Sequence, residues 1–174
     1  MASHKNVLMV EGRQDKFVIP ELIEANGVNW GTRKKPVVFI RDYDGYTKLV
    51  NPLEISTALK DSSLEALGIM VDADEYPDQR WQSLRNACLK SIPDLPVELP
   101  ETGLIHITQD GQRFGIWMMP DNRLRGMLET FLAYMVPEAN DALWTYSQVV
   151  VEEAHRKNAP FTEFHRDKAQ IYTW

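Results

Sequence analysis

Three carboxylate side chains lie within four consecutive positions of the segment GIMVDADE, residues 68–75. Asp72, Asp74 and Glu75 come directly after an apolar run that is typical of a buried strand. Ionised carboxylates repel one another, and each loses favourable hydration when it is buried. A divalent cation removes both costs, because carboxylate oxygens are ligands that Mg²⁺ prefers in proteins. The segment therefore predicts a metal site at the end of a strand.

Acidic residues also follow two other predicted strands. Glu11 comes directly after the strand expected over residues 5–10. Asp42 and Asp44 follow the strand expected over residues 36–41. The carboxyl ends of parallel strands meet at the same edge of a sheet, which is where sites form in open α/β sheets. We therefore expect these acids to converge with those of the first segment.

The spacing of the acids predicts which of them share a metal ion. Side chains alternate along an extended strand, so Asp72 and Asp74 point to the same side if the strand continues through the intervening alanine. Glu11 is expected to supply a third oxygen from a neighbouring strand, which completes a Mg²⁺ site that keeps several waters. Asp15 faces the same way as Glu11 if a helix opens at Gly12. Mn²⁺ is expected to substitute, because an all-oxygen site does not exclude it.

Two other interpretations of the acids remain open. Asp and Glu side chains often cap helices or fill turns, and a single D-x-D sequence is common. A strand-end Asp is also the reactive group of aspartyl-phosphate α/β domains, such as receivers and haloacid-dehalogenase-like phosphatases. A receiver would need paired acids after its first strand, whereas the first strand here ends in Glu-Gly. The joint placement of the acids at strand ends favours the metal site.

Strands and helices alternate over the first part of the chain, which predicts a parallel α/β sheet. After a proline-rich loop, two apolar segments flank QDGQ, whose Asp-Gly pair is typical of a β-hairpin. From residue 122 the apolar spacing is helical. We expect one domain over residues 1–174, with a mostly parallel sheet flanked by helices over about residues 5–120 and a helical C-terminal part over residues 121–174. The elements expected before the hairpin are strands over residues 5–10, 36–41 and 67–71 and helices over residues 14–25, 52–60 and 77–92.

The composition fits a cytoplasmic protein that does not enter a membrane. No apolar run approaches the ~20 residues that span a bilayer, and the N-terminus carries no signal peptide. Cys88 is the single cysteine, which excludes an internal disulfide and a cysteine-rich zinc site. The net charge of −6 argues against a general nucleic-acid coat protein but allows an enzyme with a local basic patch. A P-loop ATPase is not expected, since the chain has no GxGxxG sequence and no Walker lysine.

The sequence VEGRQDKFVIPELI, followed later by GIMVDADE, resembles the two acidic motifs of the Toprim domain. Gly45 in DYDGY matches the glycine-bearing turn between these motifs. Toprim domains share a Rossmannoid fold and occur in topoisomerases, primases, OLD-family nucleases and small RNA-processing nucleases. The resemblance covers about residues 5–120, and IWMMPDNRLRGMLETFL looks like a small stand-alone Toprim-like family related to the OLD nucleases. It implies a Mg²⁺-dependent nuclease that hydrolyses phosphodiester bonds of RNA or DNA.

The resemblance implies a role for each matching acid. Glu11 would act as a general acid or base, or as a metal ligand. Asp72 and Asp74 would bind Mg²⁺. Asp15 matches the second acid of the OLD-type motif and, with Glu129 of the GMLETF helix, would hold a second ion.

A basic residue and a partner are also implied by the resemblance. Lys168 in HRDKAQIYTW matches a late lysine that would stabilise the pentavalent phosphate. Several Toprim nucleases of this kind work in phage defence beside an ABC-type ATPase, so such a partner is implied here. The alternative is a catalytically inactive Toprim-like module that binds nucleic acid or a protein partner, which the acidic net charge favours.

Basic residues predict where nucleic acid contacts the chain. A run of three basic residues stands near Trp30, so that cations can contact phosphates while the ring stacks on a base. Two arginines follow the Met-Pro-Asp-Asn turn. Residues 141–154 carry apolar side chains that suit a homo-oligomer contact. The expected nucleic-acid-binding residues are Arg33, Lys34, Lys35, Arg123 and Arg125.

Overall fold

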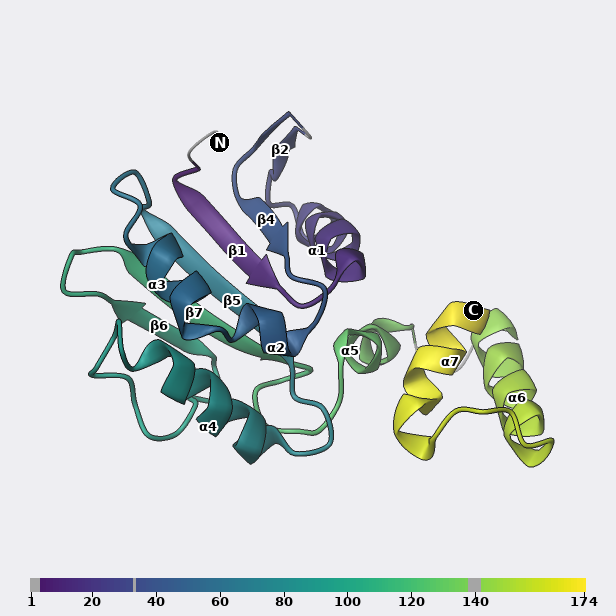
Figure 1. Ribbon diagram of the computed structural model, residues 1–174. Coiled ribbons are helices and arrows are strands. Elements are labelled where there is room, and N and C mark those ends of the chain that lie inside the picture. The colour runs from purple at the N-terminus through teal and green to yellow at the C-terminus, as the bar shows by residue number, and fades with distance from the viewer. Residues whose placement is uncertain (1–3, 33, 138–141) are drawn as a thin grey trace.

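A five-stranded sheet forms the centre of the computed structural model, which describes residues 4–32, 34–137 and 142–174 (Figure 1). Its strands are β1 (Asn6–Val10), β4 (Phe39–Asp42), β5 (Ala66–Asp72), β6 (Leu104–Ile107) and β7 (Arg113–Met119). Their order across the sheet is β4-β1-β5-β7-β6. The first four are parallel, and β6 runs antiparallel to β7 in the predicted hairpin. The prediction of a mostly parallel α/β sheet is thereby confirmed.

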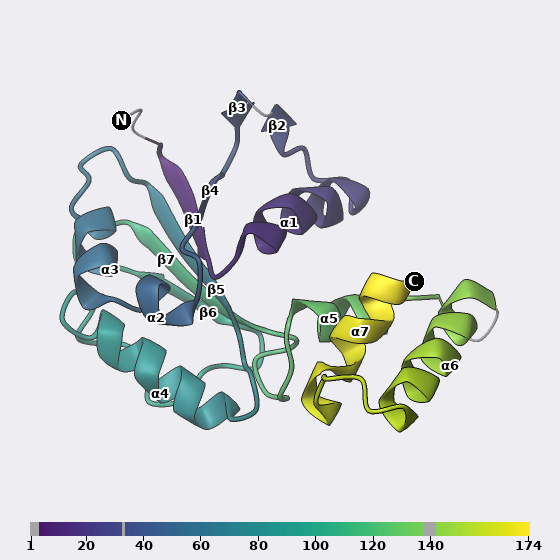
Figure 2. The same cartoon turned by 45° about the vertical axis from the view of Figure 1, so that its right-hand side comes forward.

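Helices lie on both faces of the sheet (Figures 1 and 2). On one face, α1 (Arg13–Ala25) packs Ile19 against Val10 and Ile40. The other face carries α2 (Tyr46–Leu49), α3 (Pro52–Leu59) and α4 (Pro77–Cys88). The chain thus alternates between strand and helix, as the sequence predicts.

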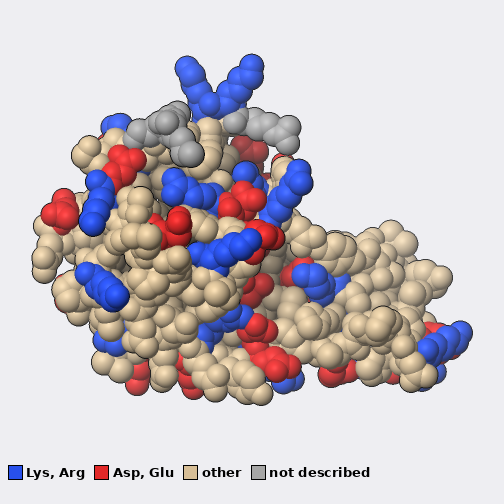
Figure 3. Space-filling model, in the orientation of Figure 1, with Lys and Arg blue, Asp and Glu red and all other residues tan. Residues whose placement is uncertain are grey.

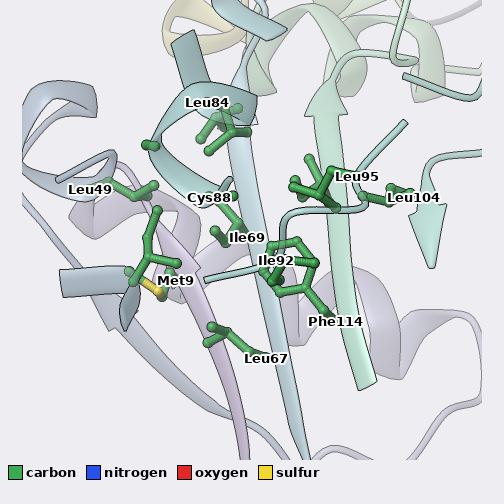
Figure 4. Close-up of a cluster of buried hydrophobic side chains, with 14 of the residues drawn as sticks. Met9, Leu49, Leu67, Ile69, Leu84, Cys88, Ile92, Leu95, Leu104 and Phe114 are labelled. Atoms are coloured by element: carbon green, nitrogen blue, oxygen red, sulfur yellow. The ribbon is translucent and has the colours of Figure 1, made fainter. Parts of the chain in front are cut away.

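The main core lies between the sheet and the helices α2, α3 and α4 (Figure 4). Side chains alternate along β5, so Leu67, Ile69 and Val71 are buried there while their neighbours point to the α1 side. Phe114 stands beside Leu67 in the register of β7 and is also fully buried. Cys88 is buried in this core, where burial raises the pKa of its thiol to about 12. The core therefore fixes the position of β5, whose end carries the acids.

The structure departs from the predicted elements most clearly in two segments, and the helix predicted over residues 77–92 ends earlier, at Cys88. The strand expected over residues 36–41 is divided, because β3 (Lys35–Pro36) pairs only with β2 (Gly31–Thr32) in a separate hairpin and β4 begins after it. The helix expected from residue 122 begins later. Asn122 has a φ of +68°, and its Oδ1 accepts a hydrogen bond from the Met118 N–H at 2.8 Å, which holds a turn instead.

The C-terminal part is helical and lies beside the carboxyl edge of the sheet (Figure 1). It consists of α5 (Leu128–Met135), α6 (Ala142–Arg156), the short 3₁₀ helix η1 (Glu163–His165) and α7 (Arg166–Thr173). α5 contacts both β7 and α7, so α7 is brought back toward the strand ends. In the part of the chain that the structure describes, none of the helices has the length and apolar character needed to cross a membrane.

Candidate functional site

A cleft of about 580 Å³ opens at the edge of the sheet where β1, β4 and β5 end. We call it the acidic cleft. Figure 3 shows acidic side chains in the region between the sheet and the C-terminal helices, with basic side chains close by. The acids that line the cleft are Glu11, Asp15, Asp42, Asp44, Asp72 and Glu129, and the cations are Arg13 and Lys168.

Glu11 and Asp72 are in direct contact. The Asp72 backbone N–H donates a hydrogen bond to Glu11 Oε1 at 2.8 Å. The carboxylate of Asp72 in turn accepts a hydrogen bond at 2.9 Å from the N–H of Leu128, the first residue of α5. The N-terminal end of a helix favours negative charge, so this hydrogen bond opposes the effects that raise the pKa of Asp72. The neighbouring strand ends thus bring these two predicted site residues together.

Three carboxyl groups of the cleft, those of Glu11, Asp15 and Asp72, are destabilised in their charged form. Burial and the charges of Glu11 and Asp15 raise the pKa of Asp72 to about 8, against the opposing hydrogen bond from Leu128. Burial also raises the pKa of Glu11 and that of Asp15. Raised carboxyl pKa values in a cleft are typical of sites that bind a cation or exchange protons. A bound cation would relieve this charge.

Asp74 lies outside the acidic cleft. β5 ends at Asp72, and Asp74 has a φ of +60°, which turns the chain out of the strand. Backbone hydrogen bonds of 2.9 and 3.1 Å with Gly126 hold this turn. The Asp74 carboxylate forms an ion pair with Arg80, whose guanidinium lies 3.8 Å from the centre of the Tyr46 ring. The condition for Asp72 and Asp74 to face the same side, an extended chain through the intervening alanine, is therefore not met.

Without Asp74, the acidic cleft offers fewer metal ligands than the sequence predicts. Among the described residues, no group of three or more His, Cys, Asp and Glu side chains is arranged closely enough to enclose a metal ion. Mg²⁺ does not require such a cage, since it is usually held by one or two carboxylates and several waters. Glu11 and Asp72 offer two carboxylates of this kind in the lining of the acidic cleft. These residues fit a magnesium ion that keeps part of its hydration shell.

The remaining predicted ligands have partners inside the protein. Asp15 accepts a hydrogen bond at 2.7 Å from the Gly12 N–H and so caps the first turn of α1. Glu129 is buried and forms an ion pair with Lys168 at 3.0 Å. Burial alone would lower the pKa of Lys168, but the hydrogen bond to Glu129 and its charge outweigh burial and raise it. The structure thus joins a predicted second-ion ligand to the predicted catalytic lysine.

The Glu129–Lys168 pair gives a test of how α7 is held at the cleft. Lys168→Met should lower the free energy of unfolding by about 2 kcal/mol, because the buried Glu129 carboxylate loses its cation. Combining it with Glu129→Gln should restore most of this loss, since no buried charge then remains. Urea unfolding of both variants measures the difference, and a Lys168→Met protein as stable as wild type would contradict it.

The predicted basic residues are dispersed. Lys34 and Lys35 lie exposed at the hairpin of β2 and β3, whereas Arg33 falls outside the described residues. Arg123 forms an ion pair with Glu101 at 2.7 Å and lines a separate pocket. Arg125 is exposed, and its charge acts on Glu163 of the C-terminal part. None of these described residues lines the acidic cleft.

Two basic residues of α1 at the acidic cleft were not among the residues predicted from the sequence. Arg13 lines the acidic cleft, and Lys16 forms an ion pair at 2.7 Å with Asp42, another residue of the cleft. The signal was available, because both residues belong to the first turns of the helix that follows Glu11. A helix that starts at a strand end places its first turns beside whatever that strand end holds.

The segment predicted to form a homo-oligomer contact, residues 141–154, carries exposed apolar side chains on α6. Leu143, Tyr146 and Val149 of α6 are all more than half exposed. Of the segment named for a homo-oligomer contact, residue 141 lies outside the described residues. The homo-oligomer stays a prediction.

Comparison with known proteins gives one match. The family model described as "Protein of unknown function (DUF3226)" matches residues 5–174. No curated protein and no solved structure matches the chain.

Proposed function

We propose that this chain, which belongs to the DUF3226 family, is a Mg²⁺-dependent nuclease that hydrolyses phosphodiester bonds of RNA or DNA. The observation that carries the proposal is the contact between Glu11 and Asp72 at the strand ends, where burial raises the pKa of both carboxyl groups. Such a cleft repels phosphate unless a cation is bound in it. We therefore expect cleavage to require a divalent metal.

The residues of the cleft can divide the chemistry among them. Asp72 and Glu11 would hold the ion, which when bound supplies positive charge to the scissile phosphate. Glu11, whose pKa is raised by burial, is placed to accept a proton from the attacking water. Lys168 lies at the cleft with its ammonium group on Glu129, where it can stabilise charge that develops on the phosphate.

The Toprim resemblance supports this proposal at some positions and departs from it at one. Glu11 and Asp72 stand at the ends of adjacent parallel strands, as the pattern requires. Asp74 departs from the pattern, because its carboxylate pairs with Arg80. A metal role for Asp74 requires that this ion pair open. An ABC-type ATPase partner and a role in phage defence belong to the same proposal and rest on the resemblance alone.

The alternative function is a catalytically inactive module that binds nucleic acid or a partner protein. Two internal ion pairs favour it. Asp74 is paired with Arg80 and Glu129 with Lys168, so that two of the predicted ligands already have a cation. This alternative predicts metal binding at the Glu11–Asp72 pair without cleavage of any nucleic acid.

Incubation with mixed single- and double-stranded RNA and DNA separates the two functions. We expect cleavage of at least one substrate in Mg²⁺ and in Mn²⁺ and no cleavage in EDTA. The products, resolved on a denaturing gel, would show which nucleic acid is cut. Metal binding by calorimetry together with intact substrates in every lane would instead establish the inactive module.

A further inference from the structure

A second groove, of about 450 Å³, lies between α1, β4 and the hairpin of β2 and β3. Figure 2 shows this hairpin and α1 on the same side of the sheet. Three aromatic side chains line the groove, and Phe17 among them is 48 % exposed. We call it the aromatic groove, and the residues that matter here are Lys16, Phe17, Trp30, Thr32, Pro36 and Phe39. Its volume is within the range of small-molecule sites and accommodates a nucleobase.

Two contacts join the aromatic groove to the acidic cleft. Lys16 lines the groove, and its ammonium group donates to Asp42 Oδ1 of the cleft at 2.7 Å. Arg13 lines the cleft, and its guanidinium lies 5.7 Å from the centre of the Phe17 ring in the groove. α1 therefore runs from the acidic cleft to the aromatic groove. A polymeric ligand bound in the cleft can continue into the groove.

The charges around the aromatic groove are unevenly placed. Lys34 and Lys35 are exposed on the hairpin, and Lys16 stands at the end that adjoins the cleft. Glu21 and Glu24 line the wall farther along α1. A phosphate backbone is attracted by the lysines and repelled by the glutamates, so it would pass over the hairpin side.

We infer that the aromatic groove binds an unpaired nucleotide of a single-stranded nucleic acid whose scissile phosphate lies in the acidic cleft; this rests on the proposed function. Unpaired bases stack on aromatic side chains, whereas the bases of a duplex are already stacked on each other. The half-exposed ring of Phe17 offers such a surface. Single-stranded RNA and single-stranded DNA share this chemistry, and the sugar distinguishes them.

Fluorescence anisotropy with labelled 12-residue oligouridine, oligothymidine and the matching duplexes tests the inference. The full chain is used with Ca²⁺ in place of Mg²⁺, and intact oligonucleotides are verified on a gel. We expect tighter binding of a single strand than of the duplex. Oligodeoxyuridine, which has the base of oligouridine and the sugar of oligothymidine, is measured as well, and its affinity against that of oligouridine identifies the preferred sugar. Phe17→Ala should weaken binding about tenfold. Phe17→Leu should weaken it similarly, because leucine keeps the apolar bulk without an aromatic face.

A matched pair of lysine variants tests the path of the backbone. Lys34→Ala combined with Lys35→Ala should weaken binding and lower the salt slope by about two. Lys60→Ala combined with Lys90→Ala removes the same charge from exposed positions after α3 and α4 and should leave binding unchanged. Equal effects of the two pairs would overturn the path over the hairpin.

The outcomes separate this inference from the proposed function. The inference that the aromatic groove binds an unpaired nucleotide is overturned by absence of binding, by a preference for the duplex, or by wild-type affinity in Phe17→Ala. Each of these outcomes is decisive even if Mg²⁺-dependent cleavage is intact. Binding of a single strand that depends on Phe17, without cleavage of any of the RNA and DNA substrates in Mg²⁺, supports nucleotide binding in the groove and overturns the nuclease.

Discussion

Replacing Asp72 by asparagine is expected to lower the rate of nucleic-acid cleavage by at least about 100-fold, since even partners of metal ligands contribute up to that factor. Asparagine removes the negative charge that holds the cation. Its side-chain oxygen can still accept the hydrogen bond from the Leu128 N–H, so the local structure should persist. Initial rates in saturating Mg²⁺, with the circular dichroism of both proteins compared, measure the effect.

Two further asparagine variants serve as controls for Asp72→Asn. Asp110→Asn lies at an exposed turn of the β6–β7 hairpin and should cut at the wild-type rate. Asp74→Asn loses the ion pair with Arg80, but its side chain lies outside the acidic cleft, so the rate should fall less than about tenfold. Cleavage by Asp72→Asn at the wild-type rate, or equal losses in Asp72→Asn and Asp74→Asn, would contradict the assignment of the metal to the Glu11–Asp72 pair.

The same substitution is expected to stabilise the protein in the absence of divalent metal. The pKa of Asp72 rises from 3.8 to about 8 on folding, so the folded chain holds a proton that the unfolded chain releases between these values. This group therefore contributes most to stability below pH 4, and the contribution is lost as the pH rises toward 8. At pH 8 the loss is on the order of 5 kcal/mol. Asp72→Asn should avoid it and raise the Tm by roughly 10 °C.

Thermal unfolding at pH 5 and pH 8, in EDTA and in Mg²⁺, checks this expectation. The advantage of Asp72→Asn over wild type in EDTA should be larger at pH 8 than at pH 5. Mg²⁺ should raise the Tm of wild type at pH 8 and leave that of Asp72→Asn unchanged, because binding to the folded state alone stabilises it. Asp110→Asn should follow wild type throughout. A Tm of Asp72→Asn below that of wild type in EDTA at pH 8 would be inconsistent with an uncompensated charge at this position.

The strand-end acids could be predicted because their positions follow from local patterns. Short apolar runs alternate with helical segments, and parallel strands must end at a shared edge. Glu11, Asp42 and Asp72 accordingly line one cleft. The adjacency of β1, β4 and β5 in the sheet then places these strand ends side by side.

The position of Asp74 could not be predicted in this way. Its left-handed backbone is held by hydrogen bonds with Gly126, and its carboxylate is drawn to Arg80 of the following helix. The first of these contacts joins segments that are far apart in the chain. The D-x-D pattern by itself cannot distinguish this turn from a strand that continues.

The C-terminal contacts are likewise set by the tertiary fold. Glu129 and Lys168 were each named from the sequence, but their ion pair depends on the packing of α5 against α7. The turn at Asn122 delays α5 until Leu128, which places the first N–H of that helix on Asp72. If the helix began at residue 122, as the apolar spacing predicted, the N–H of Leu128 would lie inside the helix and would not be free to bond Asp72.

We propose that a divalent cation is held between Glu11 and Asp72. Crystals soaked in Mn²⁺ and measured at an energy where manganese scatters anomalously locate that ion directly. We predict an anomalous peak at about 2 Å from a carboxylate oxygen of Asp72 and within the reach of Glu11 directly or through a bound water. A manganese peak beside Asp74 with none at Asp72, or no peak at all at millimolar Mn²⁺, would contradict the claim.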